Sequence, residues 1–284
     1  MSHLNKLGIV VAVPRSGSTL FMRVMAGHSD VGVTSRHVLM GHMQPRVEGV
    51  SRTFSPDYQI FENENHPVFA IARQMGKTFI MSKEEYGNDR FTGTPALNEC
   101  NYDMFPSDDV IRSVKPVFIF RRPDETFADW LARGWTDLDS FIMAYKTHLF
   151  TFERARSVNP NTVHYTHEYM IQNRDTQTKV FTSVLAACGL PFQEQMLTFQ
   201  GKFGENFLYT SDRERRIYTE ENPKGIFTTI RELTTISNTS PSYNALLKPE
   251  HQQRIGELMV DYHNLHHETL LQHENIQSRG GRTR

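Results

Sequence analysis

The sequence predicts an α/β fold organised around a parallel β-sheet. Residues 7–13 form a continuous apolar run rich in β-branched side chains, which is typical of a strand buried on both faces. A tight turn and a helical pattern follow, and the same order recurs where the apolar segment 115–121 leads through Pro123 into a second helical pattern. Strands that alternate with helices in this way usually pair in parallel, so we expect a central parallel sheet covered by helices.

The other elements follow from periodicity and from turn residues. Helices are expected where apolar side chains recur on one face, and strands where a short apolar run lies between breakers. The expected helices are 19–28, 67–73, 124–133, 140–156, 175–188 and 249–271, and the further expected strands are 78–82 and 162–165. Residues 30–65 contain several glycines and prolines, so we expect loops or short helices there, and we expect the polar stretch 201–242 to form a mobile flap.

Length and composition favour a single domain, residues 1–284, with a disordered tail at 278–284. The hydrophobic share of 38% is ordinary for a globular protein, and 31 lysines and arginines balance 32 acidic residues to a net charge of −1. So small a net charge creates no general field that attracts nucleic acid or an anionic membrane surface, and neither is an expected partner. Any anion-binding site must therefore be local.

The cysteines and the apolar runs bear on cellular location. Cys100 and Cys188 lie in no CxxC pattern, which argues against a disulfide framework or a zinc site and favours a reducing compartment. No signal-peptide core is present, so we expect a cytoplasmic protein. No apolar run approaches the roughly 20 residues of a membrane-spanning helix, so no membrane insertion is expected. The oligomeric state is open, with a homodimer as one option.

The turn after the first strand carries the groups of an anion-binding loop. Between a buried strand and a helix, successive backbone N–H groups and the positive helix end converge on one point, where a phosphate or sulfonate binds favourably. Gly17 allows close approach of the backbone, and Arg15 adds a charge that can contact two oxygens. The hydroxyl donors are Ser16, Ser18 and Thr19. No lysine follows Gly17, so the Walker A spacing is absent and ordinary ATP hydrolysis is disfavoured. The alternative is a serine-rich turn that binds nothing.

This loop, Pro14-Arg15-Ser16-Gly17-Ser18-Thr19-Leu20, resembles the 5′-phosphosulfate loop of the sulfotransferase family, which uses 3′-phosphoadenosine-5′-phosphosulfate (PAPS) as sulfuryl donor. Segment 117–123 is similar to the family's 3′-phosphate motif, in which a strand ends in an arginine, here Arg121. Further similarities cover residues 162–170 with the Gly-Leu-Pro-Phe passage at 189–192, and Lys224-Gly225 with residues 247–250. The resemblance therefore extends over nearly the whole chain.

The resemblance implies a P-loop-NTPase-like sulfotransferase fold, a three-layer sandwich with a central parallel sheet of about five strands and the nucleotide at their carboxyl ends. It also implies PAPS, or its desulfated product PAP, as the nucleotide, a small-molecule acceptor and no metal. By similarity Lys83 contacts the sulfonate, Glu85 occupies the position of the general base, and Arg15 shares the catalysis, with a solvated acidic turn as the alternative for Glu85. The implied nucleotide-binding residues are Arg15, Ser16, Gly17, Ser18, Thr19, Leu20, Arg121, Asp129, Lys224 and Gly225. The candidates for acceptor contact are Arg36, His37 and His42, with exposed loop residues as the alternative.

Two positions depart from the family pattern near the 3′-phosphate. Asp129 stands where the family usually has a serine that donates to this phosphate, and Pro223 replaces the arginine expected before Lys224. A carboxylate at this place repels a phosphate dianion. Three hypotheses follow: Asp129 points away and Arg122 substitutes, the nucleotide lacks a 3′-phosphate, or the fold serves a reaction without a nucleotide. We prefer the first.

Other functions stay open beside sulfuryl transfer. The chain can be a sulfotransferase-fold protein that binds or transforms a small molecule without PAPS, or a P-loop-like small-molecule kinase, against which the missing lysine counts. His263 and His267 lie one helical turn apart, as metal ligands can, but a solvent-facing helix is the favoured explanation. The large aromatic residues expected in the core are Phe118, Phe120, Phe127, Trp130 and Trp135.

Overall fold

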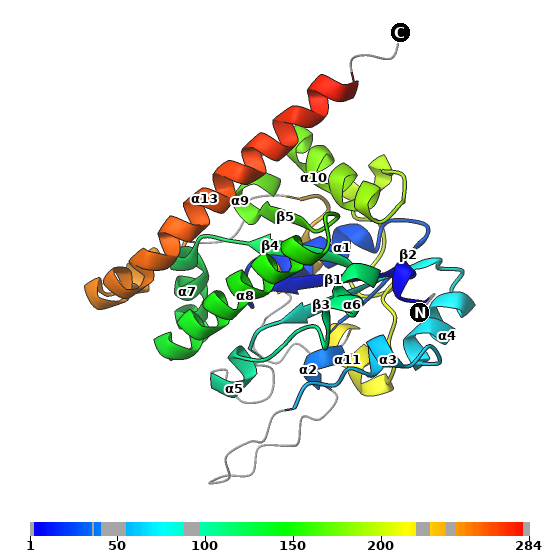
Figure 1. Ribbon diagram of the computed structural model, residues 1–284, viewed down its shortest axis with the longest axis horizontal. Helices are drawn as coiled ribbons and strands as arrows, with labels where there is room; N and C mark the ends of the chain where they lie inside the picture. The colour runs from blue at the N-terminus through cyan, green and yellow to red at the C-terminus, as the bar shows by residue number, and fades with distance from the viewer. Residues whose placement is uncertain are drawn as a thin grey trace.

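The fold is an α/β arrangement around one parallel sheet, as the alternation of elements predicts. The computed structural model describes residues 3–35, 37–40, 55–87, 97–219, 228–236 and 242–280 (Figure 1). Within these ranges a five-stranded parallel sheet has the order β2-β3-β1-β4-β5. The strands are β1 (Leu7–Ala12), β2 (Val31–Ser35), β3 (Phe79–Glu85), β4 (Lys115–Phe120) and β5 (Val163–Thr166). All but β2 overlap predicted strands, and β3 extends three residues beyond the predicted end at 82.

β1 lies at the centre because its side chains are apolar on both faces. All six of its residues are buried, and it pairs with β3 on one side and β4 on the other. Ile9 and Val11 belong to one apolar cluster, whereas Val10 and Ala12 belong to a second. The sheet therefore separates two hydrophobic layers, as the continuous apolar pattern predicts.

Helices cover both faces of the sheet and complete three layers. The long and medium helices are α1 (Ser18–Met25), α4 (Pro67–Gln74), α7 (Pro123–Ala132), α8 (Leu138–Val158), α10 (Arg174–Ala187), α11 (Asp212–Thr219) and α13 (Pro249–Gly280). The shorter elements are η1 (Leu4–Lys6), α2 (His37–Met40), α3 (Gln59–Glu62), α5 (Leu97–Cys100), α6 (Asp108–Ser113), α9 (His167–Met170), η2 (Glu194–Leu197), α12 (Thr228–Glu232) and η3 (Asn244–Leu246). One face packs on α4, α6, α7, α8 and α13, and the other on α1, α9 and α10 (Figure 1).

The strand order brings several loops to one edge of the sheet. The chain places β2 and β3 on one side of β1, then β4 and β5 on the other. In parallel sheets the carboxyl ends meet at the same edge, and ligands bind where the connections diverge. The loop after β1, the end of β3 and the residues after β4 therefore lie together at this edge.

β2 forms in a stretch for which the sequence predicts only loops or short helices. Gly32 interrupts its apolar pattern, yet a side chain at Gly32 would lie 2.7 Å from Leu208 Cδ1. The Leu208 N–H also donates to the Val33 carbonyl at 2.7 Å, which covers part of this sheet edge. The glycine is thus required by close packing and does not break the strand.

The last helix, α13, is longer than the sequence predicts. It runs through Gly280 and extends beyond the body of the molecule at its C-terminal end (Figure 1). Residues 278–280 of the expected tail are therefore helical, since no glycine or proline interrupts residues 272–279, and residues 281–284 lie outside the described residues. In the stretch expected to be a polar flap, α11 and α12 are helical. No described helix is long and apolar enough to cross a membrane.

Candidate anion-binding active site

The loop 13–17 turns tightly between β1 and α1. The Ser16 N–H donates to the Val13 carbonyl at 3.2 Å, and the Ser16 hydroxyl donates to the same oxygen at 2.7 Å. Arg15 and Gly17 both have positive φ, of 77° and 92°. A residue with a side chain costs about 1–2 kcal/mol in this region, and such strain persists only where surrounding contacts impose it.

Two side chains from neighbouring elements impose this conformation. Arg121, which follows β4, donates from Nη1 to the carbonyl of Arg15 at 2.8 Å. The indole N–H of Trp130, on α7, donates to the carbonyl of Pro14 at 2.9 Å. The loop carbonyls are therefore satisfied from one side, by residues that the sequence places far away in the chain.

His167 closes another side of the loop. Its ring packs against Gly17 so closely that a Cβ at Gly17 would lie 2.3 Å from His167 Nδ1. Burial, and next the charge of Arg121, lower the pKa of His167 to about 3, so the ring is neutral at pH 7. Nδ1 has no hydrogen-bond partner within the described part of the chain. Gly17 is thus required both by its positive φ and by its contact with this ring.

β3 brings the predicted pair Lys83 and Glu85 to the first turn of α1. Lys83 Nζ lies 3.2 Å from Glu85 Oε2 and 3.3 Å from Thr19 Oγ1. Ser18 Oγ donates to Glu85 Oε1 at 2.5 Å. Both charged side chains are only 2% exposed, so Glu85 does not lie in a solvated turn. A buried ion pair is maintained when hydrogen bonds satisfy its remaining atoms, and the two hydroxyls of α1 contribute to this.

Arg121 lies between two carboxylates of α7. Its Nη1 pairs with Asp129, and its Nη2 lies 3.5 Å from Glu125 Oε2. Asp129 therefore points toward Arg121, and the hypothesis that it points away is wrong. Arg122, the expected substitute, is paired with Asp124 at 2.6 Å. The arginine that the motif assigns to the 3′-phosphate is thus neutralised inside the protein.

The other predicted site residues are only partly placed. The side chain of Leu20 packs in the apolar core beneath the loop, so only its backbone can face a ligand. Residues predicted to contact the acceptor or the nucleotide but outside the described residues are Arg36, His42, Lys224 and Gly225, together with the departing Pro223.

His37 contacts Glu84, the residue between Lys83 and Glu85 on β3, and is engaged with its own neighbours. Its backbone N–H donates to Glu84 Oε1 at 2.9 Å, and its Nε2 lies 2.7 Å from Thr34 Oγ1. Burial, and next the charge of His66, lower the pKa of His37 to about 3. A neutral ring bonded to a hydroxyl offers an acceptor molecule no cationic contact.

Sequence reasoning misses several residues at this edge. His167 directly follows β5, which overlaps the predicted strand 162–165, so the rule that carboxyl ends meet could have indicated it. Trp130 is expected in the core for its bulk, and its indole hydrogen bond is an additional role. Ser35 pairs in register with Lys83, and its hydroxyl bonds to Tyr218 of α11, which brings that helix to the site. No local pattern indicates the contact between Ser35 and Tyr218.

The remaining predictions concern cysteines, metal ligands and core aromatics. Cys100 and Cys188 are buried free thiols. On α13, His266 Nδ1 lies 2.7 Å from Thr166 Oγ1, and the described residues contain no group of three or more side chains arranged as metal ligands. The predicted core aromatics are confirmed as buried: Phe118, Phe120, Phe127, Trp130 and Trp135.

Fold and site together define an α/β protein with a tight loop suited to an anion at the carboxyl edge of its sheet and a buried lysine and glutamate pair beside that loop. Comparison with solved structures finds the sulfotransferase domain of the Synechococcus PCC 7002 olefin synthase, at 14% identity and a TM-score of 0.45, covering 89% of this chain and 94% of that chain. Mouse sulfotransferase SULT7A1 complexed with PAP matches at 14% identity and a TM-score of 0.49, covering 96% and 89%. Retinol dehydratase in a complex with retinol and PAP matches at 12% identity and a TM-score of 0.44, covering 92% and 82%. No family model and no curated protein matches the chain.

Proposed function

We propose that this chain is a sulfotransferase-like enzyme that transfers a sulfuryl group from PAPS to a hydroxyl or amine of a small molecule. The observation that carries the proposal is the contact of the buried Lys83 and Glu85 pair with the hydroxyls of Ser18 and Thr19. This contact places a cation and a proton acceptor beside the loop that resembles a phosphosulfate loop.

The two ends of the site differ in their fit to PAPS. At the loop end, the free N–H groups of the first turn of α1, the charge of Arg15 and the ammonium of Lys83 suit a phosphosulfate. At the other end, Arg121 carries one positive charge against the two carboxylates of Asp129 and Glu125. This arrangement does not fit a 3′-phosphate dianion.

The residues at the loop end have distinct roles in the proposed reaction. When bound, PAPS would supply an electrophilic sulfuryl group for transfer to the acceptor oxygen or nitrogen, with PAP as the leaving group. Glu85 takes the proton that the acceptor loses. Arg15 and Lys83 stabilise negative charge on the transferred group and on the leaving phosphate. The fixed geometry of the loop positions these groups in advance.

Turnover of PAPS with a panel of phenols, alcohols and amines, followed as PAP formation, tests this proposal. We expect Glu85→Gln and Lys83→Met to lower the rate at least about 100-fold, in the range that general acid and base groups contribute. Glu257→Gln and Lys146→Met are matched controls, because this pair is 84% and 56% exposed, and they should leave the rate unchanged. Near-normal turnover in both site variants would show that the mechanism is wrong.

The pairing of Asp129 with Arg121 favours a second candidate function. In this candidate the nucleotide has no 3′-phosphate, or a small molecule binds or reacts without any donor. Calorimetric titration with PAP and with AMP separates the candidates, since a PAPS enzyme should bind PAP at least about tenfold more tightly, or 1.4 kcal/mol. Equal weak binding of both, or product formation that does not depend on PAPS, selects the second candidate. Arg15→Ala should weaken the binding of either nucleotide.

A further inference from the structure

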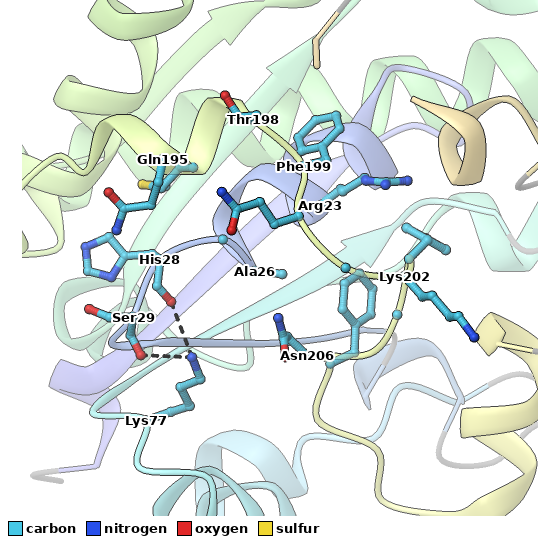
Figure 2. A pocket seen from close by; sticks show the side chains of 17 residues that line it. Arg23, Ala26, His28, Ser29, Lys77, Gln195, Thr198, Phe199, Lys202 and Asn206 are labelled. Carbon is cyan, nitrogen blue, oxygen red and sulfur yellow. Dashed lines mark hydrogen bonds between the residues drawn. The ribbon is translucent and has the colours of Figure 1, made fainter. Parts of the chain in front are cut away.

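A pocket lies at the other end of α1 from the loop 13–17. It has a volume of about 290 Å³ and is lined by the last turn of α1, the connection to β2, Lys77, η2 and residues 198–207 (Figure 2). Because α1 starts at the carboxyl edge of the sheet and runs back across it for eight residues, its two ends are about 12 Å apart. The pocket therefore lies at the amino edge and shares no lining residue with the loop 13–17.

The charged side chains that line this pocket in the described residues are all positive. Its cationic side chains are Arg23, Lys77 and Lys202, and none of the described residues that line it is acidic. In Figure 2, Lys77 is fixed by its ammonium, which donates to the carbonyls of His28 at 3.3 Å and Ser29 at 2.8 Å. A hollow that gathers cations without carboxylates concentrates anions.

Arg23 is the most unusual of these cations. Arg23 is only 7% exposed, and burial lowers the pKa of its guanidinium. Its guanidinium donates from Nη1 to the carbonyl of Ile230 and lies over the rings of Phe199 and Phe203, 4.7 Å and 5.7 Å from their centroids. Within the described ranges no carboxylate forms an ion pair with it. A buried charge without a counter-charge is costly, and one carbonyl with two ring faces leaves most of its five donors available.

The rest of the lining is apolar and aromatic. Phe203 and Phe207 form an edge-to-face pair with centroids 5.4 Å apart, and Phe199, Met196 and Ala26 lie around the same hollow. Small-molecule sites combine such apolar walls with a few polar groups that fix orientation, and this volume is at the lower end of their range. A ligand suited to this lining has an anionic head and a planar apolar body.

We propose that this pocket binds a small aromatic anion, with its carboxylate, sulfate or phosphate on Arg23 and its ring among the phenylalanines. Arg23 supplies the buried charge, and Lys77 and Lys202 supply charge nearer the opening. The site is separate from the proposed transfer reaction and does not depend on it.

Calorimetric titration with phenyl phosphate, benzoate and inorganic phosphate tests the proposal, with benzyl alcohol as the neutral analogue. We expect phenyl phosphate and benzoate to bind the wild-type protein and benzyl alcohol not to bind. Arg23→Met should weaken phenyl phosphate about 10-fold to 100-fold, since a charge-assisted hydrogen bond contributes about 1.5–3 kcal/mol. Lys202→Gln should weaken it severalfold. Lys248→Gln, whose side chain is 69% exposed and distant in the fold, should have no effect.

Arg15→Ala separates this site from the transfer site. Binding of phenyl phosphate that survives Arg15→Ala and falls in Arg23→Met and in Lys202→Gln supports the second site. Loss of binding in Arg15→Ala with full binding in Lys202→Gln would overturn it, as would equal binding of inorganic phosphate and phenyl phosphate. If Arg23→Met fails to fold, Lys202→Gln and the neutral analogue still decide. Failure of PAP to bind would bear only on the proposed transfer function.

Discussion

Arg121 and Arg23 are both arginines with only 7% of their surface exposed, but their surroundings differ completely. Arg121 is paired with Asp129, lies near Glu125 and bonds to a loop carbonyl. Arg23 has a carbonyl and two phenylalanine rings as its contacts. The arginine that a ligand-binding motif indicates is thus occupied by the protein's own carboxylates, and the arginine that no motif indicates has no carboxylate partner among the described residues. Burial of a cation therefore identifies a ligand site only after its counter-charges are known.

Breaking the Arg121 pair should have the largest effect on stability. Asp129→Ala leaves a buried guanidinium without its main partner, and we expect the free energy of unfolding to fall by about 3–5 kcal/mol. Asp109→Ala is the matched control, because the pair of Asp109 with Arg112 is 74% and 57% exposed and should contribute at most about 1 kcal/mol. Urea unfolding of both variants gives the comparison. Similar small losses would show that Asp129 is not needed to compensate Arg121.

Gly17 should come next, because the loop that Arg121 supports has no space for a side chain there. Gly17→Ala places a Cβ at positive φ and against the ring of His167, and we expect a loss of about 2–3 kcal/mol from these two causes. Adding His167→Ala should recover only the steric part. Gly256→Ala is the control, since it lies on α13 with no atom within 4 Å of the added Cβ, and it should stabilise the helix by about 0.5–1 kcal/mol. A harmless Gly17→Ala would mean that the loop adopts another conformation.

His167 also makes the Arg121 side of the molecule sensitive to acid. Its folded pKa of about 3 lies below the ordinary value of 6.5, so the unfolded chain binds the proton first as pH falls. The lowered pKa of His167 contributes to the free energy of unfolding fully above pH 6.5. This contribution is lost as pH falls toward 3, by about 2 kcal/mol between pH 7 and pH 5. Urea unfolding at these two pH values gives the loss of unfolding free energy between pH 7 and pH 5. We expect this loss to be smaller by about 2 kcal/mol in His167→Gln than in the wild-type protein. An unchanged pH dependence would show that His167 titrates normally in the folded protein.

The sequence predicts those parts of the molecule whose causes are local. The strand β1 and the loop after it follow from one apolar run and one short motif. Lys83 and Glu85 are predicted by the resemblance to the sulfotransferase family, and β3 continues past the predicted end at 82 to include both. The sequence does not predict β2, because Gly32 is needed there for close packing against Leu208, a residue far along the chain. The direction of Asp129 depends likewise on Arg121, since a motif gives the position of a side chain but not its partner.

The sequence does not predict the pocket around Arg23, for the same physical reason. Its lining comes from three separated parts of the chain, residues 23–29, Lys77 and residues 195–207, and none of them carries a pattern of its own. Within α1, Arg23 looks like an ordinary basic residue near a helix C-terminus, where it favours the helix dipole. Only the packed structure shows that this residue is buried and that the described residues around it include no acid.

The smallest expected change in stability is that of Arg23→Met, and it tests whether Arg23 and Arg121 differ in role. Replacing an uncompensated buried charge by an apolar side chain of similar length removes an unfavourable desolvation, so Arg23→Met should change the free energy of unfolding by at most about 1 kcal/mol in either direction. Arg121→Met leaves the carboxylates of Asp129 and Glu125 unpaired and should lose about 3–5 kcal/mol.

Urea unfolding in a buffer without phosphate or sulfate keeps the pocket free of added anions. Addition of phenyl phosphate should then stabilise the wild-type protein more than Arg23→Met at the same ligand concentration, because a ligand raises the stability of the folded state according to its affinity. If Arg23→Met lost as much stability as Arg121→Met without any anion, the ring and carbonyl contacts of Arg23 would be structural, and the difference between the two arginines would not indicate a ligand.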